Sequence, residues 1–219
     1  MRAHLPLLTA AALCAAACAG NAPMKDTKPD EGYAAVIYGA RFMTPAGETK
    51  SGLFRFNMEG AGGRSAVIYR MTVRPAETVL HVVEPDFYRL SVTRNILGFP
   101  QPILKVRIAG RTYRMPFPRD VLRKAPLNVK GKKVYPMGVF EVRLQQALPG
   151  QTPQVKIFLE DSVQTRRTIV QDVIHQMMDP RIQPSQRDIT IGWARALQTK
   201  LLELLAEAEA ERVPLYKTP

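Results

Sequence analysis

In the stretch Phe140-Glu141-Val142-Arg143-Leu144, apolar and charged residues alternate one by one. A period of two places alternate side chains on opposite faces of a strand, so this stretch predicts a β-strand with one buried face. The stretch Val155-Lys156-Ile157-Phe158-Leu159-Glu160 places Val155, Ile157 and Leu159 on one face in the same way. Because Leu148-Pro149-Gly150 lies between them and is typical of a turn, we expect the two strands to pair antiparallel.

Short runs of the same kind precede this pair from residue 33 onward. About nine runs are separated by Gly, Pro and Asn, and no helical periodicity appears before residue 160. This pattern favours a sandwich or a partly open barrel over a βαβ sheet. We expect a mainly β fold, an antiparallel β-sandwich over residues 33–160. The runs cover residues 33–43, 53–58, 66–73, 78–83, 87–93, 103–108, 111–115, 133–145 and 154–159.

Within these runs, the alternation identifies a core and two local features. Ala109-Gly110 predicts a tight hairpin, and Pro136 predicts an edge strand or a bulge, because proline has no N–H for a ladder. The residues expected to be buried are Tyr88, Leu90, Val106, Phe140, Val142 and Ile157.

The pattern changes to a helical one in residues 161–219, which predict a two-helix C-terminal extension. The first helix begins at Asp161 with Gln164 as a capping partner, carries an apolar face from Ile169 to Met177 and ends before Asp179-Pro180. The second, capped by Ser185 and Asp188, runs to about Val213 with an apolar stripe that includes Trp193, Leu197, Leu201 and Leu204. The stripe packs on the same domain or serves as an arm that binds a partner.

The N-terminus has the pattern of a signal peptide over residues 1–17, with a basic start and an apolar run that ends in small residues. Ala15-Ala16-Ala17-Cys18 resembles the lipobox of bacterial lipoproteins, which implies that Cys18 becomes the lipid-modified first residue. Cys14, preceded by Leu13, fits the lipobox less well; an ordinary secretory signal is the alternative. Residues 18–32 then form a flexible tether. Ala19 is not the Asp of an inner-membrane retention signal, so the resemblance implies an outer-membrane anchor that faces the periplasm.

Two segments of the predicted sandwich resemble a family. Pro85-Asp86-Phe87-Tyr88-Arg89-Leu90-Ser91 and Lys132-Lys133-Val134-Tyr135-Pro136-Met137-Gly138-Val139-Phe140 are similar to strands of the small PEGA and prealbumin-like β-sandwich domains of bacterial lipoproteins. Asp86 stands where Gly is usual, and Pro136-Met137 interrupts the second motif. The resemblance implies a small sandwich in an envelope protein and brings no catalytic residue.

The residues themselves show no enzymatic motif. His81 and His175 have no His, Cys or carboxylate at a metal-ligand spacing, and the sequence contains no G-x-S-x-G. Glu84 and Asp86 are near each other in the sequence, as the two acids of a glycosidase could be. However, Asp and Pro are common at turns for backbone reasons. We therefore expect no enzymatic activity, no cofactor and no metal ion.

Charge gives the strongest signal of function. The chain carries a formal net charge of +12, and residues 104–133 hold ten basic residues against the single acid Asp120. Such a basic band predicts an anionic partner, or a solvated face without a ligand. In the envelope that partner would be anionic lipid, lipopolysaccharide or peptidoglycan, and not nucleic acid. The candidate anion-binding residues are Lys105, Arg107, Arg111, Arg114, Lys130, Lys132 and Lys133.

These observations predict a lipid-anchored periplasmic protein of the bacterial cell envelope with a non-catalytic binding or scaffolding role. The alternative is an accessory lipoprotein subunit of an envelope transport or secretion assembly that docks on other envelope proteins through its C-terminal helix.

Overall fold

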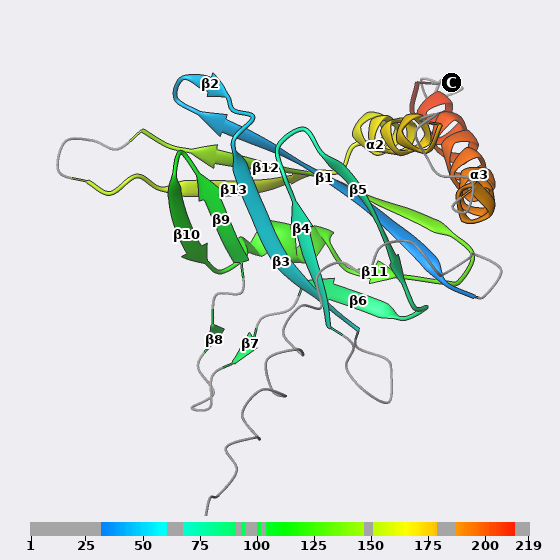
Figure 1. Ribbon diagram of the computed structural model, residues 1–219, viewed down its shortest axis with the longest axis horizontal. Helices are drawn as coiled ribbons and strands as arrows, with labels where there is room; N and C mark the ends of the chain where they lie inside the picture. The colour runs from blue at the N-terminus through cyan, green and yellow to red at the C-terminus, as the bar shows by residue number, and fades with distance from the viewer. Residues whose placement is uncertain are drawn as a thin grey trace, which may run out of the picture.

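A computed structural model describes residues 32–60, 68–90, 93–94, 100–101, 104–146, 151–178 and 187–212. The described chain is mainly β, with two larger sheets face to face and two long helices at its C-terminal end (Figure 1). The predicted fold class, a β-sandwich with a two-helix C-terminal extension, is confirmed. The expected strand runs correspond to strands of the structure wherever the chain is described.

The first sheet, sheet A, is organised around strand β1. Its five strands are β13 (Val155–Glu160), β12 (Val134–Leu144), β1 (Ala34–Thr44), β2 (Gly47–Glu48) and β5 (Thr78–Val83). Strand β1 pairs with β12 along one edge and with β5 and β2 along the other. Strands β12 and β13 form the antiparallel pair expected from their alternation.

The second sheet, sheet B, is organised around strand β3. Its six strands are β10 (Arg111–Met115), β9 (Leu104–Ile108), β3 (Gly52–Gly60), β6 (Phe87–Leu90), β11 (Leu127–Asn128) and β4 (Ile68–Val73). All of their pairings are antiparallel. A separate two-stranded ladder joins β7 (Thr93–Arg94) to β8 (Pro100–Gln101). Ala109 and Gly110 have φ angles of 48° and 75°, the left-handed values that a two-residue hairpin between β9 and β10 needs.

The pairing of β1 with β12 is parallel, which makes sheet A mixed where the sequence predicted antiparallel strands. The register shifts between Ile37, opposite Pro136, and Tyr38, opposite Gly138, so Met137 is the extra residue of a bulge. This bulge is the one expected at Pro136. Gly138 follows it with a φ of 125°, and a side chain there would meet the backbone carbonyl of Glu160.

The core between the two sheets is aromatic. Phe54 and Phe56 of β3 pack against Phe140 of β12 with ring centroids 4.9 and 5.0 Å apart, and Phe117 meets both from the side. All six residues expected to be buried are buried, namely Tyr88, Leu90, Val106, Phe140, Val142 and Ile157. The period-two alternation therefore identified the inner face of both sheets correctly.

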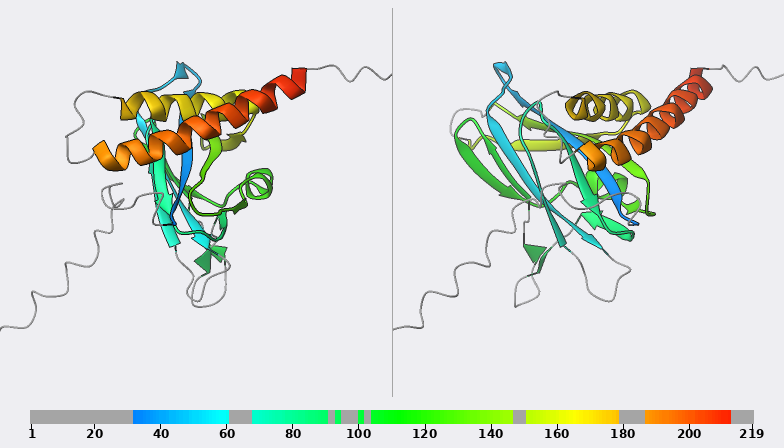
Figure 2. Two further views of the ribbon diagram at one scale, coloured as in Figure 1. Left: turned by 90° about the vertical axis from the view of Figure 1, so that its right-hand side faces the viewer. Right: turned by 45° about the vertical axis from the view of Figure 1, so that its right-hand side comes forward.

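A helical layer covers the other face of sheet A. Figure 2 shows helices α2 (Val163–Met177) and α3 (Arg187–Arg212) next to each other across this face. Ala35 and Ile37 of β1 point away from the sandwich and join Val170, Trp193 and Leu197 in a second core. Sheet A is thus the middle of three layers, sheet B, sheet A and helices.

Two local details of the helices differ from expectation. The N-cap of α2 is Ser162, whose hydroxyl accepts a hydrogen bond from the Thr165 amide at 3.3 Å, so the expected cap at Asp161 is wrong by one residue. A short helix, α1 (Arg119–Lys124), lies where no helix was expected. It buries Val121, and Lys124 Nζ contacts Asp161 Oδ1 at 2.7 Å. Two further expectations cannot be compared with the structure. They are the cap of the second helix, Ser185 with Asp188, and the end of the first helix at Asp179-Pro180, which fall on residues whose side chains or placement are not described.

Of the two expectations for the apolar stripe of α3, packing on the same domain agrees with the structure. Trp193, Leu197 and Leu204 are fully buried in the second core. The stripe therefore holds α3 onto α2 and sheet A.

Replacing Leu197 by Ala should lower the free energy of unfolding by about 2 to 5 kcal/mol, because a large side chain leaves a buried site. Leu202 on the same helix is 67% exposed and gives a matched control, since Leu202→Ala should change that free energy by less than about 0.5 kcal/mol. Urea unfolding followed by circular dichroism measures both. Equal small losses in the two variants would contradict the packed position of α3.

Candidate functional site

The outer face of sheet B carries a concentration of cations. Phe54, Phe56 and Met58 of β3 point into the sandwich, so Arg55 between them points outward. On β9, Lys105 and Arg107 alternate in the same way with buried Leu104, Val106 and Ile108. The outward cations come from β3, β4, β9 and β10 and form what we call the basic face: Arg55, Arg70, Arg74, Lys105, Arg107 and Arg114.

The strand register places three of these cations in one row across the sheet. Arg55 of β3 lies opposite Lys105 of β9, and Lys105 lies opposite Arg114 of β10. Adjacent strands are about 4.8 Å apart, and like charges directly opposite each other destabilise a sheet. The row therefore costs folding stability that a bound anion would offset.

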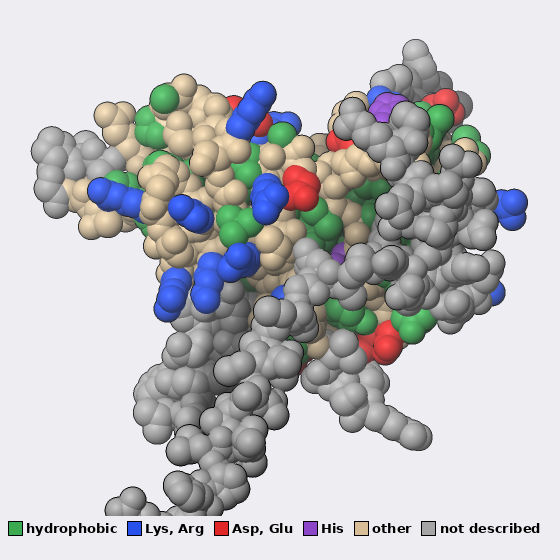
Figure 3. Space-filling model, in the orientation of Figure 1, with side chains coloured by type: hydrophobic (Ala, Val, Ile, Leu, Met, Phe, Trp, Pro, Cys, Tyr) green, Lys and Arg blue, Asp and Glu red, His purple; other side chains and the backbone are tan. Residues whose placement is uncertain are grey.

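All six side chains of the basic face are exposed, and none forms an ion pair within the described part of the chain. Figure 3 shows Lys and Arg side chains gathered over β3, β9 and β10. Strand β3 does contribute to one ion pair, between Glu59 near its C-terminal end and Arg89 of β6, at 4.0 Å. The basic face is thus a positively charged surface without side-chain ion pairs among the described residues.

A depression lies within the basic face, at the end of the sheet formed by the β9–β10 hairpin. Its volume is about 430 Å³, within the range of small-ligand sites, and Arg55, Arg74 and Arg107 all line it. Leu53 contributes an apolar side chain between them, and Thr72 and Ser51 contribute hydroxyl groups. Guanidinium groups are always charged and bind anions through paired N–H donors, so this depression can hold a multivalent anion.

The structure divides the basic band expected from the sequence. Lys105, Arg107 and Arg114 lie together on the basic face, whereas Arg111 has the parity of the inward side of β10, opposite Ile108 at the hairpin. Lys130, Lys132 and Lys133 precede β12 at the opposite end of the molecule (Figure 1), where the Lys132 amide donates to the Tyr33 carbonyl at 2.6 Å. The seven residues therefore do not form one surface.

Sequence reasoning missed half of the basic face, because Arg55, Arg70 and Arg74 belong to a different part of the chain. The signal was present, since Arg55 alternates with Phe54 and Phe56 and Arg70 with Met71. What the sequence lacks is the register that places β3 and β4 next to β9.

Of the two residues considered as a catalytic pair, Asp86 uses its carboxylate in a turn and Glu84 forms hydrogen bonds through its backbone. Asp86 Oδ1 accepts a hydrogen bond from the Phe87 amide at 2.6 Å and so shapes the turn before β6. The Glu84 amide donates to the Tyr69 hydroxyl at 3.2 Å, and the Tyr88 hydroxyl donates to the Glu84 carbonyl at 2.7 Å. Burial, with smaller contributions from Tyr69 and the two carboxylates, raises the pKa of Tyr88, which keeps it a neutral donor.

His81 belongs to the same neighbourhood and packs against an aromatic ring. Its ring meets the edge of Tyr69 with centroids 5.4 Å apart, and burial lowers its pKa below the ordinary value. Within the described ranges, no three His, Cys, Asp or Glu side chains gather where they could hold a metal ion.

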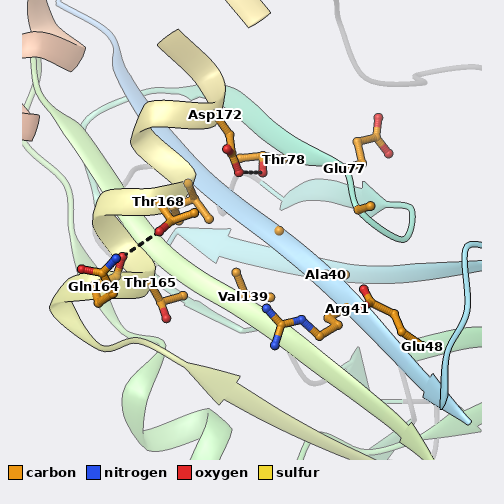
Figure 4. Close-up of a pocket in the computed structure, with 13 residues that line it drawn as sticks. Ala40, Arg41, Glu48, Glu77, Thr78, Val139, Gln164, Thr165, Thr168 and Asp172 are labelled. Carbon is orange, nitrogen blue, oxygen red and sulfur yellow. Dashed lines mark hydrogen bonds between the residues drawn. The ribbon is translucent and has the colours of Figure 1, made fainter. Parts of the chain in front are cut away.

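A second groove of about 480 Å³ lies between α2 and the uncovered end of sheet A (Figure 4). Gln164, Thr168 and Asp172 of α2 face Arg41 of β1 across it, and Asp172 Oδ2 accepts a hydrogen bond from Thr78 Oγ1 at 3.2 Å. Its lining holds Arg41 together with the three acids Glu48, Glu77 and Asp172, so it concentrates no positive charge of the kind seen on sheet B. The basic face is the stronger candidate for a site.

The fold and the site define a three-layer β/β/α protein with one strongly basic sheet face. No family model matches the sequence, and no curated protein or solved structure matches it either. Cys18, the expected signal peptide and the expected tether up to residue 31 lie outside the described ranges. Among the described helices, none has the length and apolar character needed to cross a membrane.

Replacing Lys105 by Glu should raise the free energy of unfolding by about 0.2 to 1 kcal/mol at low salt, because it ends two like-charge contacts with Arg55 and Arg114. The gain should shrink as salt rises, since charges are screened beyond about 8 Å at physiological ionic strength.

Lys50→Glu is the matched control, because Lys50 is exposed in the turn between β2 and β3 and its replacement changes the net charge equally. The difference between the two variants in urea unfolding at low and high salt isolates the local repulsion. An equal gain in both would show that the row on sheet B carries no repulsion of its own.

Proposed function

We propose that this protein is a lipid-anchored, non-catalytic component of the bacterial cell envelope that binds an anionic envelope surface through the basic face of sheet B. The observation that carries the proposal is the set of six exposed cations on one sheet face, without ion-pair partners in the described ranges. A sheet that serves only as a structural layer has no need of this arrangement, since it lowers stability.

Attachment by lipid is the second part of the proposal, and the sequence supports it. An apolar run that ends in Ala15-Ala16-Ala17-Cys18 resembles a lipobox, and residues 18–32 would link the anchor to the start of β1. More than one acyl chain gives stable membrane attachment, at about 0.8 kcal/mol for each buried CH₂ group. In this proposal the protein faces the periplasm from the outer membrane.

The basic face of the anchored protein would then bind anions close to the membrane. Each Lys or Arg near an anionic membrane surface contributes about 1 kcal/mol of binding, so six cations on one face give substantial attraction even when salt screens part of it. Anionic lipid, lipopolysaccharide and peptidoglycan are the anions at this location, which is why nucleic acid is not proposed as a partner.

Resemblance to the PEGA and prealbumin-like sandwich domains is also a proposal. Its two segments fall on β6 (Phe87–Leu90) and on the first half of β12 (Val134–Leu144). Both segments are strands of the sandwich, which agrees with the kind of element that the family motifs describe.

Docking through the C-terminal helix, the alternative role, would have to use the outward side of α3. Its apolar stripe is buried within the domain, and the side left open carries Leu202 together with Glu203 and other acidic residues. We therefore propose binding through the basic face rather than docking through α3.

Binding to anionic vesicles tests the basic face. For the chain that begins at Ala19 and carries no lipid, the combined change Lys105→Gln, Arg107→Gln and Arg114→Gln should weaken binding about a hundredfold, at about 1 kcal/mol for each cation removed. Wild-type binding should itself weaken as salt rises.

The matched control replaces Lys130, Lys132 and Lys133 by Gln, which removes the same charge at the opposite end of the molecule. Vesicle co-sedimentation measures all three proteins. An equal loss in both triple variants would mean that net charge alone drives binding, and the assignment to sheet B would then be wrong.

Replacing Cys18 by Ala should abolish lipid attachment and leave unprocessed precursor or released protein, whereas Cys14→Ala should leave the anchored form unchanged. Mass spectrometry of the mature N-terminus and membrane fractionation measure both results. An unmodified wild-type N-terminus at or beyond Ala19 would overturn the lipid anchor.

A further inference from the structure

We propose that the depression bounded by Arg55, Arg74 and Arg107 is a binding site for the phosphomonoester headgroup of a membrane lipid. This inference rests on the proposed function, because it names the chemical group that the basic face recognises. It goes beyond that function in predicting selection among anions, which a diffuse positive surface does not provide.

The three arginines reach the depression from three neighbouring strands. Arg107 of β9 lies opposite Leu53, Arg55 follows two residues later on the same face of β3, and Arg74 directly follows the end of β4 at Val73. Leu53 thus has Arg107 on one side, Arg74 on the other side, and Arg55 two residues farther along its own strand. The register therefore places the three arginines around Leu53 and not in one row across the strands.

Their chemistry suits a group with three terminal oxygens. A guanidinium donates two parallel hydrogen bonds to paired oxygens, and this geometry is specific to arginine. A phosphomonoester offers three strong acceptor oxygens and a charge of about −1.5 to −2 at pH 7. A phosphodiester or a carboxylate has two free oxygens, so it leaves at least one of the three arginines without a full partner.

No acidic side chain is among the described residues that line the depression. Glu77 is the nearest carboxylate in sequence to Arg74, and its Oε2 accepts a hydrogen bond from the Arg74 backbone amide at 2.9 Å. This bond holds Glu77 in the turn after β4, and it forms no ion pair with the Arg74 side chain among the described residues. The guanidinium groups of the depression remain available to a ligand.

Leu53 favours a lipid as the source of the phosphate. It is half-buried between the arginines, and an apolar side chain gives a free phosphate ion no favourable contact. A lipid headgroup brings carbon atoms next to its phosphate that can cover Leu53. The depression is also part of an open sheet face, which a flat membrane surface can approach.

The test compares vesicles that contain phosphatidic acid, a phosphomonoester, with vesicles that contain phosphatidylglycerol, a phosphodiester, adjusted to equal surface charge. The chain beginning at Ala19 should bind the phosphomonoester vesicles about tenfold more tightly, as expected for additional charge-assisted hydrogen bonds. The combined variant Arg55→Lys, Arg74→Lys and Arg107→Lys keeps every charge and should lose this preference, while its binding to phosphatidylglycerol changes less than about twofold.

A matched variant, Arg70→Lys with Arg111→Lys and Arg114→Lys, makes the same chemical change outside the depression and should keep the preference. Thermal unfolding of each variant confirms that it is folded, and Arg107→Lys alone provides a milder change with a partial loss of preference. A preference that survives in the depression variant would overturn the site.

The remaining outcomes separate the inference from the proposed function. Salt-sensitive wild-type binding to both vesicles without preference would overturn the phosphomonoester site and leave the proposed function standing. Absence of binding to either vesicle would overturn both. Inorganic phosphate, added at constant ionic strength, should displace the protein only weakly; displacement at concentrations equal to those of the lipid headgroup would overturn the lipid as its source.

Discussion

Strand β1 is covered on both faces and along both edges. Tyr38 and Phe42 point into the sandwich core, Ala35 and Ile37 point into the helical core, and β12 and β5 flank the strand. Because a strand buried on both faces must be apolar throughout, β1 reads as a nearly continuous apolar segment rather than an alternating one. Both cores depend on its position, since each is built against one of its faces.

This arrangement also explains why the charged surface lies where it does. Sheet A has its two faces occupied by sheet B and by the helices, whereas in the described ranges sheet B is covered on its inner side alone. Its outer side is free to carry polar residues at every second position, and the chain uses those positions on four strands for cations. The three-layer order thus leaves one sheet face exposed, and that face is basic.

The sequence predicted which residues form strands and which face of each strand is buried, because both follow from a local period of two. Parallel pairing of β1 with β12 was not predictable in this way, since alternation identifies a strand's faces but not its neighbours. The same limit explains the partial success at the candidate site. Lys105, Arg107 and Arg114 follow one another closely in the chain, whereas Arg55 and Arg74 join them through the register of β3 and β4. Lys130, Lys132 and Lys133 are near these residues in the chain, but the fold places them at the opposite end of the molecule.

The central position of β1 also sets the order in which the protein can fold. Ala35 near the N-terminus pairs with Val134, about a hundred residues later, so the contact order of sheet A is high and its formation should be slow. Until β12 has arrived, one long edge of an apolar strand has no partner, and open edges of this kind promote association between chains. A strand that the folded protein encloses on both faces is therefore an aggregation hazard while the chain folds.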